Sequence, residues 1–397
     1  MNTMPDKNRR RFLMTSAGGA AAAGLAGFAP AALAQGKPLP PVAAWKDIDR
    51  LIVHSANGIE TKRSAFGDGV LTDNDILFLR NNLGAPSASI MANPDAWSVE
   101  LDGVTSPRSV TVGELKTMGI ETVPMVLQCS GNGRGFFGHK ASGSQWKVGA
   151  AGCSMWTGVP VKTVVAALGG VRQGMRYMTG TGGETIPAGV EPMKVMVERS
   201  VPWNVMERAI LAWELNGEAL PLAHGGPLRL VIPGYYGVNN IKYIKRLAFT
   251  VDETKANIQA SGYRVRPIGQ KGAPTQASMW DMNLKSFVTS PAGDEPVRAG
   301  VVQVHGVAFS GTSAVKDVEV SLDGGGKWLP ASFSGPLLGP YAWRRFVLPV
   351  RLSAGTYTIT SRASAYDGQV QPELRVENER AYAHNGWRDH AVKVTVA

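Results

Sequence analysis

The sequence predicts an α+β domain followed by an antiparallel β-sandwich of immunoglobulin-like size. Between residues 45 and 252, short β-like runs alternate with helical stretches, and Gly or Pro stands at nearly every junction. From residue 301 onward, short β-rich segments follow one another at a spacing typical of a sandwich. The chain has 397 residues, 44% hydrophobic and 18% charged, which is enough for two or three domains with sizeable cores.

The N-terminal segment has the composition of an export signal. Three consecutive arginines at positions 9–11 precede a weakly apolar Ala/Gly run that ends at Ala34. This order predicts a twin-arginine signal peptide over residues 1–34. A transmembrane anchor is disfavoured, because Gly and Pro interrupt the run and it is shorter than the ~20 apolar residues of a membrane span. Because this route exports folded proteins, typically around a loaded cofactor, we expect a periplasmic protein with no membrane span after signal removal.

The α+β domain is predicted to cover residues 45–276. Its expected strands are residues 97–104, 122–128, 228–232 and 241–251, and its expected helices are residues 110–117 and 159–168. Glycine-rich stretches at 131–138 and 179–183 predict long loops of the kind that wrap a cofactor. The Gly-, Gln- and Pro-rich stretch 252–282 is the expected connection to the next domain.

The sandwich is predicted to cover residues 277–397. Its expected strands are residues 301–309, 315–322, 343–350, 356–364 and 390–396. The turn sequence Asp323-Gly324-Gly325-Gly326 separates the second of these runs from the third.

The charge balance points to an anionic substrate or an acidic partner. The formal net charge is +10, and the first 34 residues carry four basic side chains and one acidic one, which leaves +7 for the rest. An excess of this size can steer anions toward the protein. Nucleic acid is a poor reading, since no run of Lys and Arg interleaved with aromatic residues occurs.

Three common cofactor motifs are disfavoured or missing. Residues 133–138 satisfy G-x-G-x-x-G, but the polar, glycine-rich stretch that follows does not predict the helix that a dinucleotide pyrophosphate requires. A c-type haem is excluded from this chain because no Cys-x-x-Cys-His occurs. The six histidines are scattered without the spacing of a zinc site.

Cys129 is the candidate metal ligand. It ends a strand-like run and opens a glycine-rich loop that contains Arg134, so its sulfur would be exposed beside positive charge. These conditions lower a thiol pKa and present a thiolate to a soft metal. Two alternatives remain open at this point: a small buried hydrophobic residue at a strand end, and a disulfide with Cys153.

Several motifs resemble the sulfite oxidase family. Residues 128–134, Gln-Cys-Ser-Gly-Asn-Gly-Arg, resemble that family's Cys-x-Gly-Asn-x-Arg segment. Further matching segments stand around it in the same order as in the family, at residues 78–82, 146–150, 156–159, 212–218, 224–229, 233–234 and 241–243. Residues 306–309 and 318–324 resemble the family's dimerisation domain. The resemblance covers most of the chain after about residue 70, and it implies a molybdopterin-binding domain followed by an immunoglobulin-like dimerisation domain.

The resemblance implies a molybdenum centre on one molybdopterin, with Cys129 as the protein ligand to the metal. Polar and basic residues would hold the pterin and its phosphate by charge-assisted hydrogen bonds; they are Arg80, Asn81, Asn82, His224, Arg229 and Lys242. The substrate pocket would use Arg80, Arg134 and Tyr263, with Trp146 as its wall. The family also brings an arginine from near the C-terminus, and Arg388 is the expected candidate.

The implied activity is that of a periplasmic sulfite dehydrogenase, a homodimer that oxidises sulfite to sulfate. The chain has no haem motif, so the electrons would pass to a separate c-type cytochrome. The runner-up is the sulfane dehydrogenase subunit of a thiosulfate-oxidising system, which acts on carrier-bound sulfur. A reductase of S-oxides is disfavoured because such proteins lack the sandwich. The alternative from a different class is a non-catalytic exported binding module built on the sandwich. Such a protein would purify without molybdenum.

Overall fold

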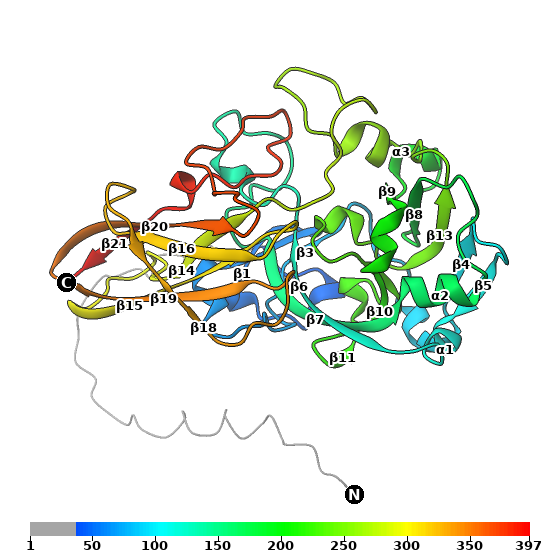
Figure 1. Ribbon diagram of the computed structural model, residues 1–397, viewed down its shortest axis with the longest axis horizontal. Helices are drawn as coiled ribbons and strands as arrows, with labels where there is room; N and C mark the ends of the chain where they lie inside the picture. The colour runs from blue at the N-terminus through cyan, green and yellow to red at the C-terminus, as the bar shows by residue number, and fades with distance from the viewer. Residues whose placement is uncertain (1–36) are drawn as a thin grey trace, which may run out of the picture. The chain divides into compact units, whose positions relative to one another are not determined.

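The computed structural model describes residues 37–397, so the export signal predicted at residues 1–34 lies outside the described residues. The described residues form five β-sheets and three short α-helices, α1 (Val112–Leu115), α2 (Val161–Ala167) and α3 (Pro192–Val195). Among residues 37–397, no helix combines the length and the apolar character required to cross a membrane. In Figure 1, strands β14 to β21 gather in one half of the ribbon, and the cyan and green strands form the other half.

Three sheets build the N-terminal half. The smallest has the order β1–β2–β3, the second has the order β11–β10–β7–β6 with β12 paired to β10, and the third has the order β5–β4–β13–β8–β9. All pairings in these sheets are antiparallel except that of β4 with β13. The strands are β1 (Leu51–Ser55), β2 (Gly58–Thr61), β3 (Leu79–Arg80), β4 (Ser98–Asp102), β5 (Arg108–Thr111), β6 (Glu121–Gln128), β7 (Ala151–Pro160), β8 (Tyr177–Gly182), β9 (Glu198–Pro202), β10 (Ile210–Leu215), β11 (Glu218–Ala219), β12 (Arg229–Val231) and β13 (Ile244–Thr250).

The helix expected at residues 159–168 forms, but it begins later. Val161, Val164, Val165 and Leu168 recur at helical spacing and are all buried in the largest apolar cluster of this half. Helix α2 starts at Val161 because the residues before it belong to β7. It ends at Ala167 with Leu168 as its C-cap, and the next residue, Gly169, has φ 82°, a left-handed conformation that glycine adopts without strain.

The hairpin of β6 and β7 brings one strand end into the interior. Their register runs from Glu121 opposite Gly158 to Gln128 opposite Ala151, so the loop of residues 129–150 leaves and re-enters at the Gln128 end. The first residues of β6 are exposed, whereas its last four are buried. The residue that follows β6, Cys129, therefore lies inside the protein rather than at a surface turn.

Two four-stranded sheets form the C-terminal half, with the orders β14–β15–β19–β18 and β17–β16–β20–β21. An apolar cluster between them contains alternate residues of facing strands, such as Val302 and Val304 of one sheet and Val318 and Val320 of the other. The strands are β14 (Lys285–Ser290), β15 (Gly300–Phe309), β16 (Val315–Ser321), β17 (Leu329–Pro330), β18 (Ser332–Ser334), β19 (Arg344–Leu352), β20 (Gly355–Ala365) and β21 (Val392–Val396). The predicted fold class, an α+β domain followed by a β-sandwich, is confirmed; the boundary at residue 277 stays a prediction.

The two halves share an apolar core. Val126 and Cys153 of the β6–β7 hairpin belong to the same buried cluster as Phe287 and Phe309 of the sandwich. Polar contacts add to it, because the Trp343 indole N–H donates to the carbonyl oxygen of Val70 at 2.7 Å. The sandwich is thus packed against the strand that carries Cys129.

Candidate active site

Cys129 is held at the end of β6 by a clamp centred on Asn132. The Cys129 amide donates to the Ala150 carbonyl oxygen at 2.9 Å, and the Asn132 amide donates to the Cys129 carbonyl oxygen at 2.9 Å. The Asn132 side chain donates to Gln128 Oε1 at 3.1 Å and to the Val148 carbonyl oxygen at 3.2 Å. It also accepts from the Ala150 amide at 3.1 Å. These bonds tie both ends of the loop to one side chain, so the position of the sulfur is defined by backbone geometry.

Cys129 lies in the wall between two cavities. The inner one extends from Cys129 toward Arg229 and Lys242. The outer one is more open and extends toward the segments 257–272 and 379–382. Four residues line both cavities, and they are Arg80, Asn82, Cys129 and Tyr263. Cys129, a residue only 8% exposed, therefore faces both cavities.

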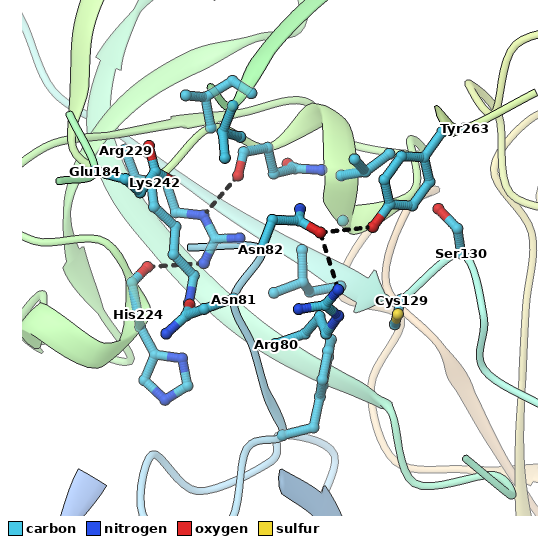
Figure 2. Close-up of a pocket in the computed structure, with 17 residues that line it drawn as sticks. Arg80, Asn81, Asn82, Cys129, Ser130, Glu184, His224, Arg229, Lys242 and Tyr263 are labelled. Carbon is cyan, nitrogen blue, oxygen red and sulfur yellow. Dashed lines mark hydrogen bonds between the residues drawn. The ribbon is translucent and has the colours of Figure 1, made fainter. Parts of the chain in front are cut away.

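The inner cavity is lined by cations (Figure 2). Lys242 Nζ donates to Asn81 Oδ1 and to the Ala223 carbonyl oxygen, both at 2.6 Å, and Arg229 Nη1 donates to the His224 carbonyl oxygen at 2.8 Å. Burial lowers the pKa of Lys242 and of His224 well below their usual ranges, and it lowers the pKa of Arg229 to about 10. Desolvation is the largest cause in all three, and mutual repulsion adds to it for Lys242 and His224. The negative charge of a bound anion would offset the cost of desolvation and the repulsion between these side chains.

Buried polar atoms without partners line the same cavity. His224 Nε2, Ser130 Oγ and Glu184 Oε2 are buried, and none of them has a hydrogen-bond partner among the described residues. Burial raises the pKa of the Glu184 carboxyl to about 7. Because unpaired polar groups in a dry interior are costly, such a set indicates a polar ligand that completes the bonds. The donors and the carboxyl fit a heterocycle that carries both N–H groups and a phosphate.

The outer cavity presents arginines and stacked tyrosines. Arg134 is buried, and it donates from Nε to the Arg380 carbonyl oxygen and from Nη1 to the Ser144 carbonyl oxygen, both at 3.2 Å. The Arg134 guanidinium lies 5.5 Å from the ring centroid of Tyr382. The Tyr382 ring stacks on Tyr263 with centroids 5.1 Å apart and an interplanar angle of 7°. Several permanent cations in one partly dry pocket favour a small oxyanion.

Asn82 links the two cavities. Its Oδ1 accepts from Arg80 Nη2 at 2.9 Å and from the Tyr263 hydroxyl at 3.1 Å. In Figure 2, these three side chains lie beside Cys129. Asn82 therefore orients a guanidinium and a hydroxyl next to the sulfur.

The structure brings most of the predicted site residues together. The inner cavity is lined by all the predicted cofactor-binding residues, and these are Arg80, Asn81, Asn82, Cys129, His224, Arg229 and Lys242. Arg134 lines the outer cavity, and Tyr263 lines both. The alternative of a disulfide between Cys129 and Cys153 is wrong, because both cysteines are free in the structure.

Two predicted pocket residues do not line either cavity. Trp146 is fully buried in the cluster that contains Cys129, with its ring 4.9 Å from His54, so it lies behind the site. Arg388 is exposed and pairs with Glu373. The reason is local: Arg388 begins a 3-10 helix, Arg388–His390, whose inward-facing residue is His390.

Arg380 occupies the place expected for a C-terminal arginine. It lines the outer cavity, donates from Nη1 to Ser142 Oγ at 2.8 Å, and has a buried Nε without a partner among the described residues. Sequence reasoning also missed Ser130, Glu184 and Tyr382. Ser130 stands inside the motif of Cys129 and could have been found there, whereas no local pattern marks Glu184 or Tyr382.

Comparison with known protein families gives two matches. Residues 85–258 match the oxidoreductase molybdopterin binding domain, and residues 276–397 match the Mo-co oxidoreductase dimerisation domain. The lined inner cavity lies mostly within the first of these ranges. Its cations, its unpaired donors and its carboxyl fit a molybdopterin.

Similar proteins include sulfite oxidases and nitrate reductases. The chain is 28% identical over 351 residues to mitochondrial sulfite oxidase of Homo sapiens, covering 83% of this chain and 62% of that protein. It is 29% identical over 337 residues to sulfite oxidase of Gallus gallus, covering 80% of this chain and 72% of that protein. It is 28% identical over 364 residues to nitrate reductase [NADH] 2 of Phaseolus vulgaris, covering 84% and 40%. The chain thus spans less than two thirds of the human relative's length.

A solved structure extends the likeness to the whole described chain. The sulfane dehydrogenase SoxCD from Paracoccus pantotrophus superimposes with a TM-score of 0.72 at 27% identity, over 94% of this chain and 96% of that one. Both family matches, the sequence relatives and this structure agree on one architecture. The chain belongs to the sulfite oxidase family of molybdopterin oxidoreductases, with a molybdopterin-binding domain that implies a molybdenum-molybdopterin cofactor and a dimerisation domain after it.

Proposed function

We propose that this protein is a periplasmic sulfite dehydrogenase. Sulfite and water would become sulfate, two protons and two electrons. The observation that carries the proposal is the position of Cys129 in the wall between a cation-lined inner cavity and an arginine-lined outer one. A molybdenum centre held by that sulfur supplies two-electron oxygen-atom transfer when it is bound.

The inner cavity would hold the pterin. Lys242, Arg229 and His224 supply donors for the phosphate, and the Glu184 carboxyl can accept from N–H groups of the heterocycle. Two of these side chains are already bonded: Lys242 donates to Asn81 and to the Ala223 carbonyl, and Arg229 donates to the His224 carbonyl. They therefore bind without further ordering, which lowers the entropic cost of binding.

The outer cavity would bind and orient the substrate. Sulfite is a small dianion at neutral pH, and planar guanidinium groups pair with its oxygens through two parallel hydrogen bonds. Arg134 and Arg380 would hold it from one side and Arg80 from the other. Asn82 keeps Arg80 and the Tyr263 hydroxyl aligned, and Tyr263 can hold a proton beside the reacting oxygen.

The electron acceptor is proposed to be a separate c-type cytochrome. The chain contains two cysteines and no Cys-x-x-Cys-His, so it has no haem attachment motif of its own. Export by the twin-arginine route would bring the loaded protein into the compartment where such cytochromes occur. The dimerisation domain supports a homodimer.

A sulfane dehydrogenase is the second candidate. The superposition on the Paracoccus pantotrophus protein covers nearly all of both chains, and that protein is described as a sulfane dehydrogenase. The outer cavity also opens along the segment 266–272, where Arg266 and Lys271 add positive charge. A mouth of this kind can admit a sulfur atom carried on a peptide as well as a free dianion.

The substrate test is an assay of the native protein with two substrates. Purified holoenzyme is mixed with ferricytochrome c and either free sulfite or a carrier protein that bears a persulfide. We expect reduction with free sulfite alone. Reduction that requires the loaded carrier would reject the sulfite proposal in favour of the second candidate, and a preparation made without molybdenum serves as the blank for both arms.

Arg380 rather than Arg388 should govern sulfite affinity. In the variant Arg380→Gln, the substrate loses one charged hydrogen-bond donor, so KM for sulfite should rise by roughly 10- to 100-fold, the equivalent of one bond to a charged group. The matched variant Arg388→Gln removes the same charge from the surface and should leave KM within about twofold, as surface ion pairs contribute little. Equal effects of the two changes would reject this assignment.

A further inference from the structure

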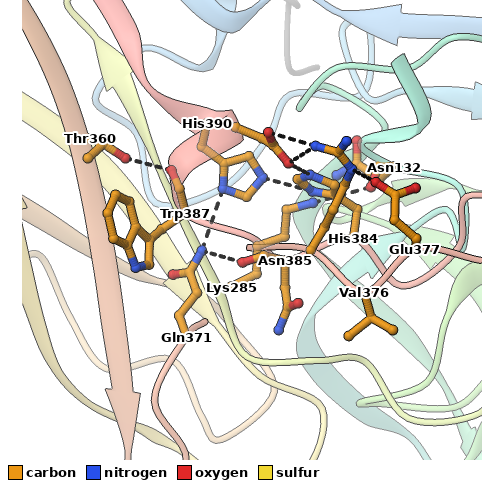
Figure 3. Close-up of polar contacts among 12 residues, drawn as sticks. Asn132, Lys285, Thr360, Gln371, Val376, Glu377, His384, Asn385, Trp387 and His390 are labelled. Carbon is orange, nitrogen blue, oxygen red and sulfur yellow. Dashed lines mark hydrogen bonds and ion pairs between the residues drawn. The ribbon is translucent and has the colours of Figure 1, made fainter. Parts of the chain in front are cut away.

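A buried polar cluster lies beneath the loop that follows Cys129 and belongs to neither cavity. Figure 3 shows it between the sandwich and that loop. Its centre is a pair of imidazoles, those of His384 and His390, with His384 Nδ1 and His390 Nε2 3.2 Å apart. Both rings are buried, and neither lines the cavities described above. Their role is therefore not explained by substrate or cofactor binding.

The outer ends of the pair face two acceptors. His384 Nε2 lies 2.9 Å from Asp389 Oδ2, and His390 Nδ1 lies 3.1 Å from the Ser286 carbonyl oxygen. Asp389 also accepts two bonds from Arg375 Nη1, at 2.9 and 2.8 Å. Burial opposes its charge, but the hydrogen bonds from His384 and Arg375 lower the pKa of Asp389 below its usual range. Asp389 is therefore a carboxylate that needs donors.

Gln371 removes the remaining ambiguity in the direction of these bonds. Its Oε1 accepts from the Ser286 amide at 2.8 Å, which defines the orientation of its side-chain amide. Its Nε2 donates to the carbonyl oxygens of Ser286 at 3.2 Å and Asn385 at 2.9 Å, so both of its hydrogens are used. Gln371 Nε2 also lies 3.5 Å from His390 Nδ1, a longer contact than either of its bonds to the two carbonyl oxygens. The arrangement therefore assigns a hydrogen to His390 Nδ1, which bonds the Ser286 carbonyl at 3.1 Å.

The three contacts of the two rings determine how many hydrogens the pair of imidazoles carries. One hydrogen points to the Ser286 carbonyl, one lies between the rings, and one points to Asp389, which makes three hydrogens on two rings. Two neutral imidazoles carry only two. A neutral pair would leave two acceptor atoms facing each other in a dry interior, where an unmade bond is costly. The geometry therefore favours an imidazolium next to the Asp389 carboxylate.

Charges from the neighbouring elements act on the pair in both directions. Burial is the largest effect, and it lowers the pKa of His384 to about 4 and that of His390 well below its usual range. Lys285 of β14 lowers the pKa of both rings, Arg375 lowers that of His384, and His384 and Arg63 lower that of His390. These effects oppose the charge that the hydrogen-bond geometry requires. The Asp389 carboxylate raises the pKa of His384. Burial also lowers the pKa of Lys285 to about 7, so Lys285 can be neutral beside the imidazolium.

The pair supports the loop on which Arg134 stands. A Cβ built on Gly133 would lie 2.4 Å from His384 Cγ, so the loop backbone rests directly on the ring; Gly133 has φ 102°. The Phe136 ring lies 5.2 Å from the His384 ring. The backbone next to His384 completes the contact, since the Ala383 amide donates to the Ser130 carbonyl oxygen at 3.0 Å. His384 thus touches the residues on both sides of Arg134.

We propose that His384, protonated and paired with Asp389, is a positioning residue that holds the loop of Arg134 in the orientation needed to bind an anion. The pair acts through contact with Gly133 and Phe136 and not on the substrate. This inference rests on the proposed function only in naming sulfite as the anion. Loss of the carboxylate should remove the extra proton, weaken the bond at His384 and let the loop shift.

The first test counts the protons in the native holoenzyme. Nitrogen-15 labelling of histidine and two-bond proton–nitrogen correlation spectra report which ring nitrogens carry hydrogen, with His384→Gln used to assign the signals. We expect three protonated nitrogens in the pair at pH 7. Two neutral rings with one hydrogen each would overturn the proposal, whatever the variants do.

The second test separates positioning from folding. In the Asp389→Asn holoenzyme, KM for sulfite should rise roughly 10-fold while kcat changes by less than about threefold and the molybdenum content stays native, as a displaced binding group predicts. The control Glu373→Gln removes an acid from the surface pair with Arg388 and should change neither constant. An unchanged KM in Asp389→Asn would overturn the proposal.

Binding of sulfate, measured by calorimetry on the same proteins, makes the inference independent of turnover. We expect the same loss of affinity in Asp389→Asn as for sulfite. If the native protein fails to oxidise sulfite, the proposed function fails, yet weaker sulfate binding in the variant would still support the positioning role. Native-like sulfate binding in Asp389→Asn would reject that role alone.

Discussion

The Cys129→Ser variant should lose sulfite oxidation while it keeps its fold. The hydroxyl of serine is a poor ligand for a soft, thiolate-binding metal, so the centre would lose its protein bond. The loss should exceed the roughly 10²- to 10³-fold effect of removing one preorganised donor from an active site. Far-ultraviolet circular dichroism and melting temperature measure the fold, and sulfite-dependent reduction of cytochrome c measures the activity.

Cys153→Ser is the matched control for this change. Cys153 is fully buried on β7 in the core shared with the sandwich, and burial raises the pKa of its thiol to about 12. It therefore stays a neutral thiol and has no catalytic use. The serine hydroxyl in that apolar site should destabilise the fold by about 1–3 kcal/mol, with activity retained. Full activity in Cys129→Ser would remove the central assignment.

Lys242→Met should yield protein with little pterin. Burial lowers the pKa of Lys242 well below its usual range, and its two short bonds already place its side-chain nitrogen against Asn81 and the Ala223 carbonyl. Methionine keeps the length of the side chain but offers no charge and no donor. The loss of one bond to a charged phosphate, about 1.5–3 kcal/mol, corresponds to a decrease in affinity of roughly 10- to 100-fold. Molybdenum and pterin analysis of purified protein measures it.

The control for this variant is Lys245→Met. Lys245 stands three residues further along the chain, is exposed, and lies with its ammonium 5.9 Å from the ring centroid of Trp97. Its replacement should leave the pterin content unchanged, because it does not line the cavity. Native pterin content in Lys242→Met would show that the inner cavity does not bind the phosphate through this lysine.

Local pattern predicted the regular elements where one face is buried. The run predicted at 315–322 became β16, Val315–Ser321, because Val318 and Val320 alternate toward the sandwich core. The run 159–168 contains a helix for a similar reason, but its first two residues joined β7 through pairing with β10. Long-range strand pairing thus moved the helix start, and no window of local sequence contains that information.

The rejected dinucleotide motif also separates what the local sequence predicts from what long-range contacts decide. The pattern at 133–138 predicts a loop by its glycines, and the structure forms only a 3-10 turn at Arg134–Phe136. The sequence could not reveal that Gly133 is required because the His384 ring occupies the space of a Cβ. That contact joins residues about 250 positions apart, and it exists only once the sandwich has docked.

The motifs around Cys129, Arg80 and Lys242 resemble one family, and that resemblance was sufficient to identify the family and part of the lining of the inner cavity. The choice of Arg380 over Arg388, the place of Trp146 behind the site, and the histidine pair under the loop were decided only by the tertiary structure. The physical reason is that these side chains are oriented by contacts between the two halves. Such contacts depend on packing and on the pairing of buried polar groups, which chain order does not encode locally.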